Sequence, residues 1–218
     1  MTPPNAALST AAPAKAYRVM GVDPGSIHTG YGIIDLAGTR IELVTAGRIS
    51  SDPKTTMPER LKNIFERLGE LIETHKPMAM SLETIYTGIN PQSAFKLAEA
   101  RGVVVLCSAI AGLPLLEYAP GTIKLSVCGY GTADKAQVAF MARKILKTEE
   151  AFPPDATDAL AIAITHANNL SLNSINYGPG RANVLSGEFA KGRETKNFRK
   201  LSVSDLQALG FKIDGAKE

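Results

Sequence analysis

Two aspartates, Asp155 and Asp158, lie three residues apart at the start of an otherwise small and apolar run, PPDATDALAIAITH. Residues i and i+3 share one face of a helix, so both carboxylates can point at one cation. Helix capping is the simpler interpretation, because Asp is a favoured N-cap residue and acids in the first turn interact well with the helix dipole. Capping explains one of the two acids. A metal site would explain both, but it needs further carboxylates from elsewhere in the chain.

Two further carboxylates come at the ends of predicted strands. Asp23 ends the run YRVMGVD, and Glu83 comes near the end of the short apolar run MAMSLET. In α/β sheets the functional crevice lies at the carboxyl ends of central strands. If these two strands are neighbours, Asp23 and Glu83 emerge side by side, and the final helix can bring Asp155 and Asp158 to the same edge. The sequence therefore predicts a cluster of four acids.

Such a cluster carries a formal charge of −4, and like-charge repulsion disfavours it unless cations compensate. Two divalent ions would do so, and oxygen-only ligands favour Mg²⁺ or Mn²⁺ over zinc. Two such ions can activate a water and stabilise the leaving oxygen of a displacement at phosphorus. No His or Cys is adjacent in sequence to any of the four acids, and we expect ordinary roles for His28, His75 and His166, with His166 covering the end of its helix.

The elements that must position these acids can be read from periodicity and turn residues. Strands 17–23, 29–36 and 40–50 are joined so tightly that they should form an antiparallel meander. A helix is predicted for 57–76, because its apolar residues recur at helical spacing, and it makes a crossover to the strand at 78–84. The remaining predicted elements are a long helix at 92–112, a strand at 115–119, a short helix after Pro120, and helices at 135–147 and 154–169. This order predicts an α/β fold with a five-stranded mixed sheet, an antiparallel meander plus parallel strands, and helices on both faces.

The length of 218 residues and the apolar content of 44% fit one globular domain with tails. We expect a disordered N-terminal extension at 1–16, one folded domain at 17–169, and a basic, mostly disordered tail at 170–218. The tail contains KGRETKNFRK, which is either a solvated segment or an accessory DNA contact. The longest apolar stretch, 102–116, is too short to cross a bilayer, and the N-terminus lacks a signal-peptide pattern, so a cytoplasmic location is expected.

Several motifs together resemble the RuvC family of Holliday-junction resolvases. They are GVDPGSIHTGYGIID, SLETIY, SAFKLAEARGVV, GYGTADKAQV and PPDATDALAIAITH, which span roughly residues 17–168 in the order of the family. The resemblance implies an RNase H-like fold and a homodimer. The implied activity is that of a structure-specific endonuclease, which cuts two strands of a four-way DNA junction symmetrically with Mg²⁺ or Mn²⁺ during recombination and repair. It also suggests association with the RuvA–RuvB branch-migration complex.

The resemblance assigns roles to individual residues. The acids that match its catalytic and metal-binding positions are Asp23, Glu83, Asp155 and Asp158. Tyr86 matches an aromatic residue used near the junction centre, where a ring can stack on an unpaired base. Asn90 lies in the same loop and is expected to contact DNA, and Lys124 and Lys135 match basic residues that flank the active site. Thr84 and Ile89 depart from the family pattern, which often has Gln and a basic residue at these two positions.

Three alternatives remain open. DPGSIHTGYG alone also fits the phosphate-binding hairpin of an actin-like ATPase, although such proteins need a second related domain and a second phosphate motif. An RNase H-like nuclease that acts on RNA would use the same acids. A junction-binding module with vestigial acids is disfavoured, because grouped carboxylates without a catalytic purpose are destabilising.

Overall fold

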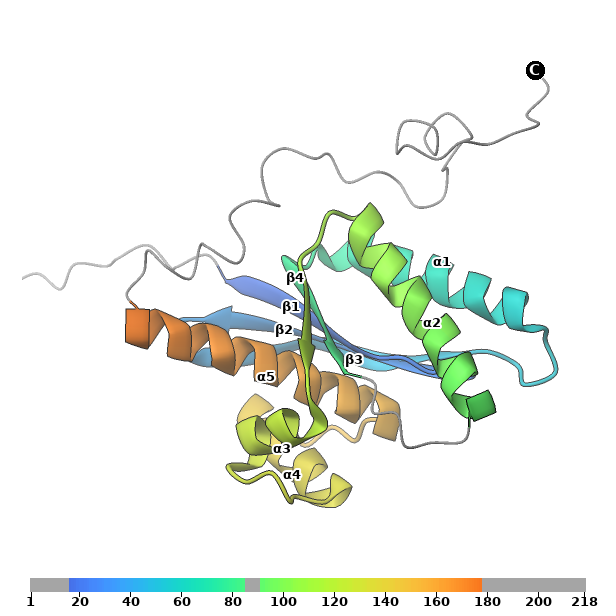
Figure 1. Cartoon of the computed structure of the whole chain (residues 1–218). Helices are drawn as coiled ribbons and strands as arrows, with labels where there is room; N and C mark the ends of the chain where they lie inside the picture. The colour runs from blue at the N-terminus through green and yellow to red at the C-terminus, as the bar shows by residue number, and fades with distance from the viewer. Residues whose placement is uncertain (1–15, 85–90, 178–218) are drawn as a thin grey trace, which may run out of the picture.

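The structure, a computed structural model, describes residues 16–84 and 91–177. Its centre is a five-stranded sheet with the strand order β3-β2-β1-β4-β5. The strands are β1 (Tyr17–Asp23), β2 (His28–Ala37), β3 (Arg40–Ser50), β4 (Ala79–Glu83) and β5 (Leu115–Tyr118). Figure 1 shows helices on both sides of this sheet, as the sequence predicted.

The sheet is mixed, with β1 at its centre. β1 pairs with β2 and β2 with β3 in antiparallel fashion, which is the predicted meander. β4 pairs with β1 on one side and β5 on the other, both in parallel. The prediction that the first and fourth strands are neighbours is therefore confirmed.

Each face of the sheet has its own helical layer. α1 (Met57–His75) and α2 (Pro91–Ile110) cover one face, and α5 (Pro154–Tyr177) crosses the other together with α3 (Pro120–Cys128) and α4 (Lys135–Leu146) (Figure 1). Alternating side chains of β1 supply the two cores: Val19 packs in the α5 layer, whereas Met20 and Val22 pack in the α1–α2 layer.

α5 is longer than its apolar pattern suggested. The helix continues to Tyr177, beyond residue 169, where the sequence predicted the domain to end. Adding a turn to an established helix is far easier than starting one, so the polar residues after Leu170 extend it. His166 consequently lies inside the helix, and the expectation that it covers a helix end is wrong. Its Nδ1 is 2.7 Å from the hydroxyl of Tyr118 at the end of β5.

Glycines allow α5 to lie directly on the backbone of β1 and β2. A Cβ placed on Gly21 would come within 2.1 Å of the carbonyl oxygen of Ala159, and one on Gly30 within 1.9 Å of that of Asp155. Gly32 similarly faces Leu160, whose side chain and backbone would lie 2.8 Å from an added Cβ. Any larger residue at these positions would force the helix away from the sheet.

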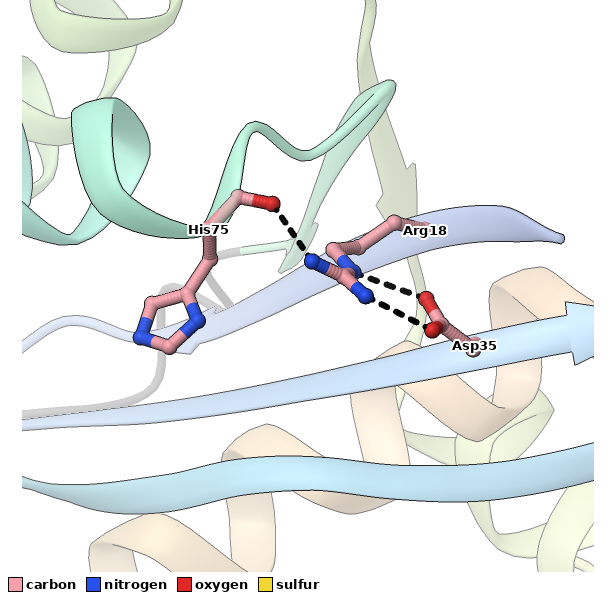
Figure 2. Close-up of polar contacts among 3 residues, drawn as sticks. All are labelled: Arg18, Asp35 and His75. Atoms are coloured by element: carbon pink, nitrogen blue, oxygen red, sulfur yellow. Dashed lines mark hydrogen bonds and ion pairs between the residues drawn. The ribbon is translucent and has the colours of Figure 1, made fainter.

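The other end of β1 is held by a partly buried arginine network. Figure 2 shows the guanidinium of Arg18 between Asp35 of β2 and the end of α1. Its Nε and Nη2 donate to the two carboxylate oxygens of Asp35, and its Nη1 donates to the carbonyl oxygen of His75, each over 2.8 Å. Such a bidentate pair ties the meander to α1 at the end of β1 opposite Asp23.

Among the described residues, no helix is both long enough and apolar enough to cross a membrane. Most of the two predicted tails, at 1–16 and 170–218, lies outside the described residues, so their division from the domain stays a prediction.

Candidate active site

The carboxyl ends of β1 and β4 place two acids next to each other. Val22 pairs with Leu82 in the parallel register, so Asp23 and Glu83 are the next residues on adjacent strands. The turn after Asp23 is fixed by the buried Thr29, whose Oγ1 donates to the carbonyl oxygen of Gly25 over 2.7 Å and accepts from its amide over 3.3 Å. The strand end that carries Asp23 is therefore well defined.

The first turn of α5 brings Asp155 and Asp158 to the same edge. The helix begins at Pro154, a favoured residue at the first helical position. Asp155 is thus inside the first turn, where the helix dipole favours an acid, and not at the N-cap. Because Gly30 admits the backbone of Asp155 so closely, the start of α5 lies against β2, which pairs with β1 at Asp23.

The four acids are close enough to act on one another's charge. Burial is the largest cause that raises the pKa of Asp23, and with the charges of Asp158, Glu83 and Asp155 it brings this pKa to about 7 against the opposing charge of Lys135. Burial and the charge of Asp158 also raise the pKa of Glu83, against the effect of Lys135 and Lys124. Repulsion among grouped carboxylates is the condition that bound cations would relieve.

Lys135 is the cation most directly joined to this cluster. Its Nζ donates to Oδ2 of Asp158 over 2.8 Å, and this hydrogen bond raises the pKa of Lys135. The lysine stands at the start of α4, where Asp134 caps the helix by accepting from the amide of Gln137. Capping therefore fixes the point from which Lys135 reaches the acid.

Lys124 of α3 lies on the same side. A small cavity of about 90 Å³ is lined by both lysines together with Glu83 and Asp158, and by Pro120, Ile123, Val138, Ala161 and Ile162. The structure thus brings both predicted lysines beside the acids, from two different helices.

Arg48 of β3 was not anticipated from the sequence. Its Nη1 lies 3.5 Å from Oδ2 of Asp155. An arginine within a predicted strand does not by itself indicate a functional site. The strand register shows the place of Arg48, which pairs with Gly30 of β2, and Gly30 in turn pairs with Asp23 of β1.

The donor set suits a hard divalent cation, because it consists of carboxylate oxygens. Within residues 16–84 and 91–177, however, no three Asp, Glu, His or Cys side chains already have an arrangement that could hold a metal ion. The two acids of α5 are instead turned to Lys135 and Arg48. Metal binding at this edge would require these carboxylates to reorient, so the metal-ligand assignment stays a prediction.

Tyr86 and Asn90, and the departure at Ile89, lie outside the described residues. The chain enters that loop at Thr84, whose amide donates to the carbonyl oxygen of Tyr118 over 2.9 Å and so continues the β4–β5 pairing past Glu83.

Comparison with protein families gives one match that spans most of the chain. The family model described as crossover junction endodeoxyribonuclease RuvC matches residues 19–166. The RuvC protein of Hyphomonas neptunium is 45% identical over 155 residues, covering 71% of this chain and 93% of its own length. That of Brevibacillus brevis is 40% identical over 162 residues, covering 74% of this chain and 98% of its own length.

Comparison with solved structures also matches this chain to a RuvC protein. The chain matches Thermus thermophilus RuvC in complex with a Holliday junction substrate, with a TM-score of 0.69 and 32% identity over 72% of this chain and 97% of that one. The yeast mitochondrial Holliday junction resolvase Ydc2 shares the fold, with a TM-score of 0.53 and 14% identity over 73% of this chain and 81% of its own.

Proposed function

This chain belongs to the RuvC family of crossover junction endodeoxyribonucleases, and we propose that it resolves Holliday junctions at the edge formed by Asp23, Glu83, Asp155 and Asp158. The observation that carries the proposal is the convergence of acids from β1, β4 and α5 with Lys135 beside them. The chain would act as a hydrolase that cuts a pair of phosphodiester bonds on opposing strands of the junction.

RuvC nucleases are metal-dependent, and we assign the four acids to the metal in this chain. We propose two Mg²⁺ ions per site, with Mn²⁺ able to replace them, because carboxylate oxygens prefer such ions. When bound, the ions supply charge that activates the attacking water and stabilises the leaving oxygen. The repulsion that raises the pKa of Asp23 favours the binding of cations at this edge.

The lysines would act on the substrate directly. Lys135 and Lys124 border the cavity between Glu83 and Asp158, so a phosphate that approaches these acids meets two positive charges. Neutralising phosphate charge supports binding of any DNA sequence and holds the strand for cutting. Lys135 has a second role, since it orients the carboxylate of Asp158.

Selection of the junction over duplex DNA would come from the loop between Glu83 and α2. We propose that Tyr86 stacks on an opened base at the junction centre, which contributes on the order of 1–3 kcal/mol, and that Asn90 contacts the same DNA. Tyr86→Ala should then slow cleavage of intact junctions with little loss of binding, and Tyr86→Phe should keep the wild-type rate. Equal rates for Tyr86→Ala and wild type would remove the stacking role.

Paired cutting requires two sites, and we propose a homodimer formed through α2. Phe95 is 73% exposed and Leu106 is 44% exposed on this helix, and they lie three turns apart on the face that also carries the exposed Gly102. Large exposed apolar side chains of this kind commonly form subunit interfaces. Phe95→Glu should give monomers in sedimentation at micromolar concentration, and a wild-type protein that sediments only as a monomer would contradict the dimer.

Association with the RuvA–RuvB branch-migration complex and a cytoplasmic location are part of the same proposal and rest on family membership alone. The basic segment KGRETKNFRK is a candidate accessory contact with the DNA.

The decisive experiment is incubation with a synthetic four-way junction and Mg²⁺, with paired nicks on opposing strands as the readout. Linear duplex and an RNA–DNA hybrid serve as control substrates, and ATP hydrolysis is measured in parallel. We expect symmetric nicking of the junction alone, and no ATP hydrolysis. Preferred cutting of the hybrid would favour the RNA-directed alternative instead, and ATP turnover would favour the actin-like one.

A further inference from the structure

Arg48 reaches the acids from β3, whereas Lys135 reaches them from α4. Arg48 lies on β3 across from Gly30, and its guanidinium approaches Asp155 while its side chain remains 35% exposed. Lys135 comes from α4 and binds Asp158. Each acid of α5 thus has its own cation, and the two cations belong to different layers of the fold.

The two pairings differ in closeness. Lys135 Nζ is 2.8 Å from Asp158 Oδ2, within hydrogen-bond distance, whereas Arg48 Nη1 is 3.5 Å from Asp155 Oδ2. Among the described residues, Asp23 and Glu83 have no ion pair. A divalent cation that binds beside these acids therefore competes with Arg48 for Asp155. The Arg48–Asp155 contact that it displaces is the longer of the two ion pairs.

The guanidinium cannot relieve that competition by losing its proton, because arginine stays charged in proteins. It must turn away. Beside it lies a cavity of about 310 Å³ between β3 and α1, lined by Arg48 together with Asn63 and Arg67 among other residues. This cavity, whose lining also includes Glu70, leaves the part-exposed side chain of Arg48 room to turn from Asp155. A guanidinium is well suited to bind phosphate with two parallel hydrogen bonds.

We propose that Arg48 exchanges partners: it neutralises Asp155 in the metal-free protein and moves to a backbone phosphate of the cut strand when a divalent cation takes Asp155. The inference rests on the proposed function, since it assumes that Asp155 is a metal ligand. It adds a substrate contact from β3 to those proposed for the two lysines.

Arg48→Gln separates this role from a structural one, because it removes the charge and keeps a polar side chain of similar reach. In the DNA-free protein, Mn²⁺ titrated in a calorimeter should bind about 3–10-fold more tightly to the variant, since a competing positive charge is gone. Arg48→Lys should retain most of the wild-type Mn²⁺ affinity. Arg40→Gln is the matched control: Arg40 is an exposed arginine at the other end of β3, paired with Glu42, and its loss should leave Mn²⁺ binding unchanged.

Thermal unfolding supplies a second readout. Arg48→Gln should lower the melting temperature in EDTA, and saturating Mn²⁺ should remove the difference from wild type, because the cation then compensates Asp155. A purely structural arginine would lower the melting temperature equally in both conditions.

Junction binding measured in Ca²⁺ tests the second half of the exchange. We expect the affinity of Arg48→Gln for the junction to be about 3–10-fold lower than that of wild type. The salt dependence of its binding should correspond to one fewer phosphate contact. Unchanged or weaker Mn²⁺ binding, a melting difference that persists in Mn²⁺, or unchanged junction affinity would each overturn the proposal. These outcomes compare Arg48 variants with wild type, so they are distinct from failure of the proposed function, which would appear as a wild-type protein that does not nick junctions.

Discussion

Gly30 lies directly opposite Asp23 in the β1–β2 pair, and a Cβ on Gly30 would lie only 1.9 Å from the carbonyl oxygen of Asp155. This glycine of β2, beside the strand that carries the first acid, thus lets the start of the helix that carries two others lie against the sheet. The placement of the acids depends on this backbone contact as much as on the acids themselves.

Gly30→Ala should therefore reduce junction cleavage by about 100-fold or more, because shifting a catalytic group by about 1 Å has effects of this size. The start of α5 has to move, while the lysines that bind phosphate stay in place, so junction affinity should change little. Cleavage rate, junction affinity and melting temperature are the measurements. Gly121→Ala is the control, since a Cβ there meets nothing within 4 Å; equal cleavage by both variants would show that the close approach is unimportant.

Replacing either acid of α5 should abolish cleavage. Asp155→Asn and Asp158→Asn remove a charged oxygen ligand and leave the basic residues intact, so junctions should still bind in gel-shift assays while nicking falls to background. If either Asn variant cut at the wild-type rate in Mg²⁺, that acid would not be a metal ligand.

The raised pKa of Asp23 predicts that the free energy of unfolding of the metal-free protein decreases as the pH rises. This pKa is raised to about 7 in the folded state, beside Glu83, Asp155, Asp158 and Lys135. The folded state binds the proton more strongly than the unfolded state, whose Asp pKa is about 3.9. This stabilising contribution is complete below about pH 4 and is lost as the pH rises to about 7, by on the order of 2–4 kcal/mol.

Chemical denaturation in EDTA between pH 5 and pH 8 measures that loss. Asp23→Asn cannot ionise, so it should be more stable than wild type at pH 8, and the difference should shrink at pH 5. Adding Mg²⁺ at pH 8 should stabilise wild type and not the variant. Equal stability of the two proteins at pH 8 in EDTA would contradict the raised pKa.

The lowered pKa of His166 predicts the opposite trend, in which the free energy of unfolding decreases as the pH falls. Burial lowers the pKa of His166 to about 4, and its charged or titratable neighbours are the hydroxyl of Tyr118 and the ring of Tyr17. An unfolded histidine has a pKa of about 6.5, so the folded state holds fewer protons between these values. The contribution of His166 to the free energy of unfolding is complete above about pH 6.5 and decreases by about 2–3 kcal/mol as the pH falls towards 4.

His166→Gln should make unfolding in saturating Mg²⁺ less sensitive to pH between 7 and 5 than it is in wild type. His28→Gln, at an exposed position, is the control and should keep the wild-type profile. A His166→Gln profile that coincides with wild type would show that the buried ring does not titrate in this range.

The acids were predictable because each follows a local rule. Asp23 and Glu83 end apolar strands, and the crossover helix between them implies adjacent parallel strands. Asp155 and Asp158 share a helix face by spacing alone. These inferences need only the periodicity of single elements and one topological rule.

The remaining features depend on contacts between elements distant in sequence. Arg48 joins the site through two successive strand registers, Gly30 through the approach of a helix from the far end of the chain, and His166 through a hydrogen bond to β5. Periodicity does not contain this information, because the packing distance between a helix and a sheet is set by both partners at once.

The late place of α5 in the order of the chain has a consequence for synthesis. The ribosome makes the β1 and β4 acids early, but the helix that completes the cluster is the last described element of the chain. Domains form as their segments emerge, at about 5–20 residues per second, and contacts between distant segments close last. A nascent chain that has not yet released α5 has neither of its aspartates and none of the backbone that seats on Gly21 and Gly30. The four acids therefore cannot come together before α5 has been made, so a shorter nascent chain lacks the complete cluster.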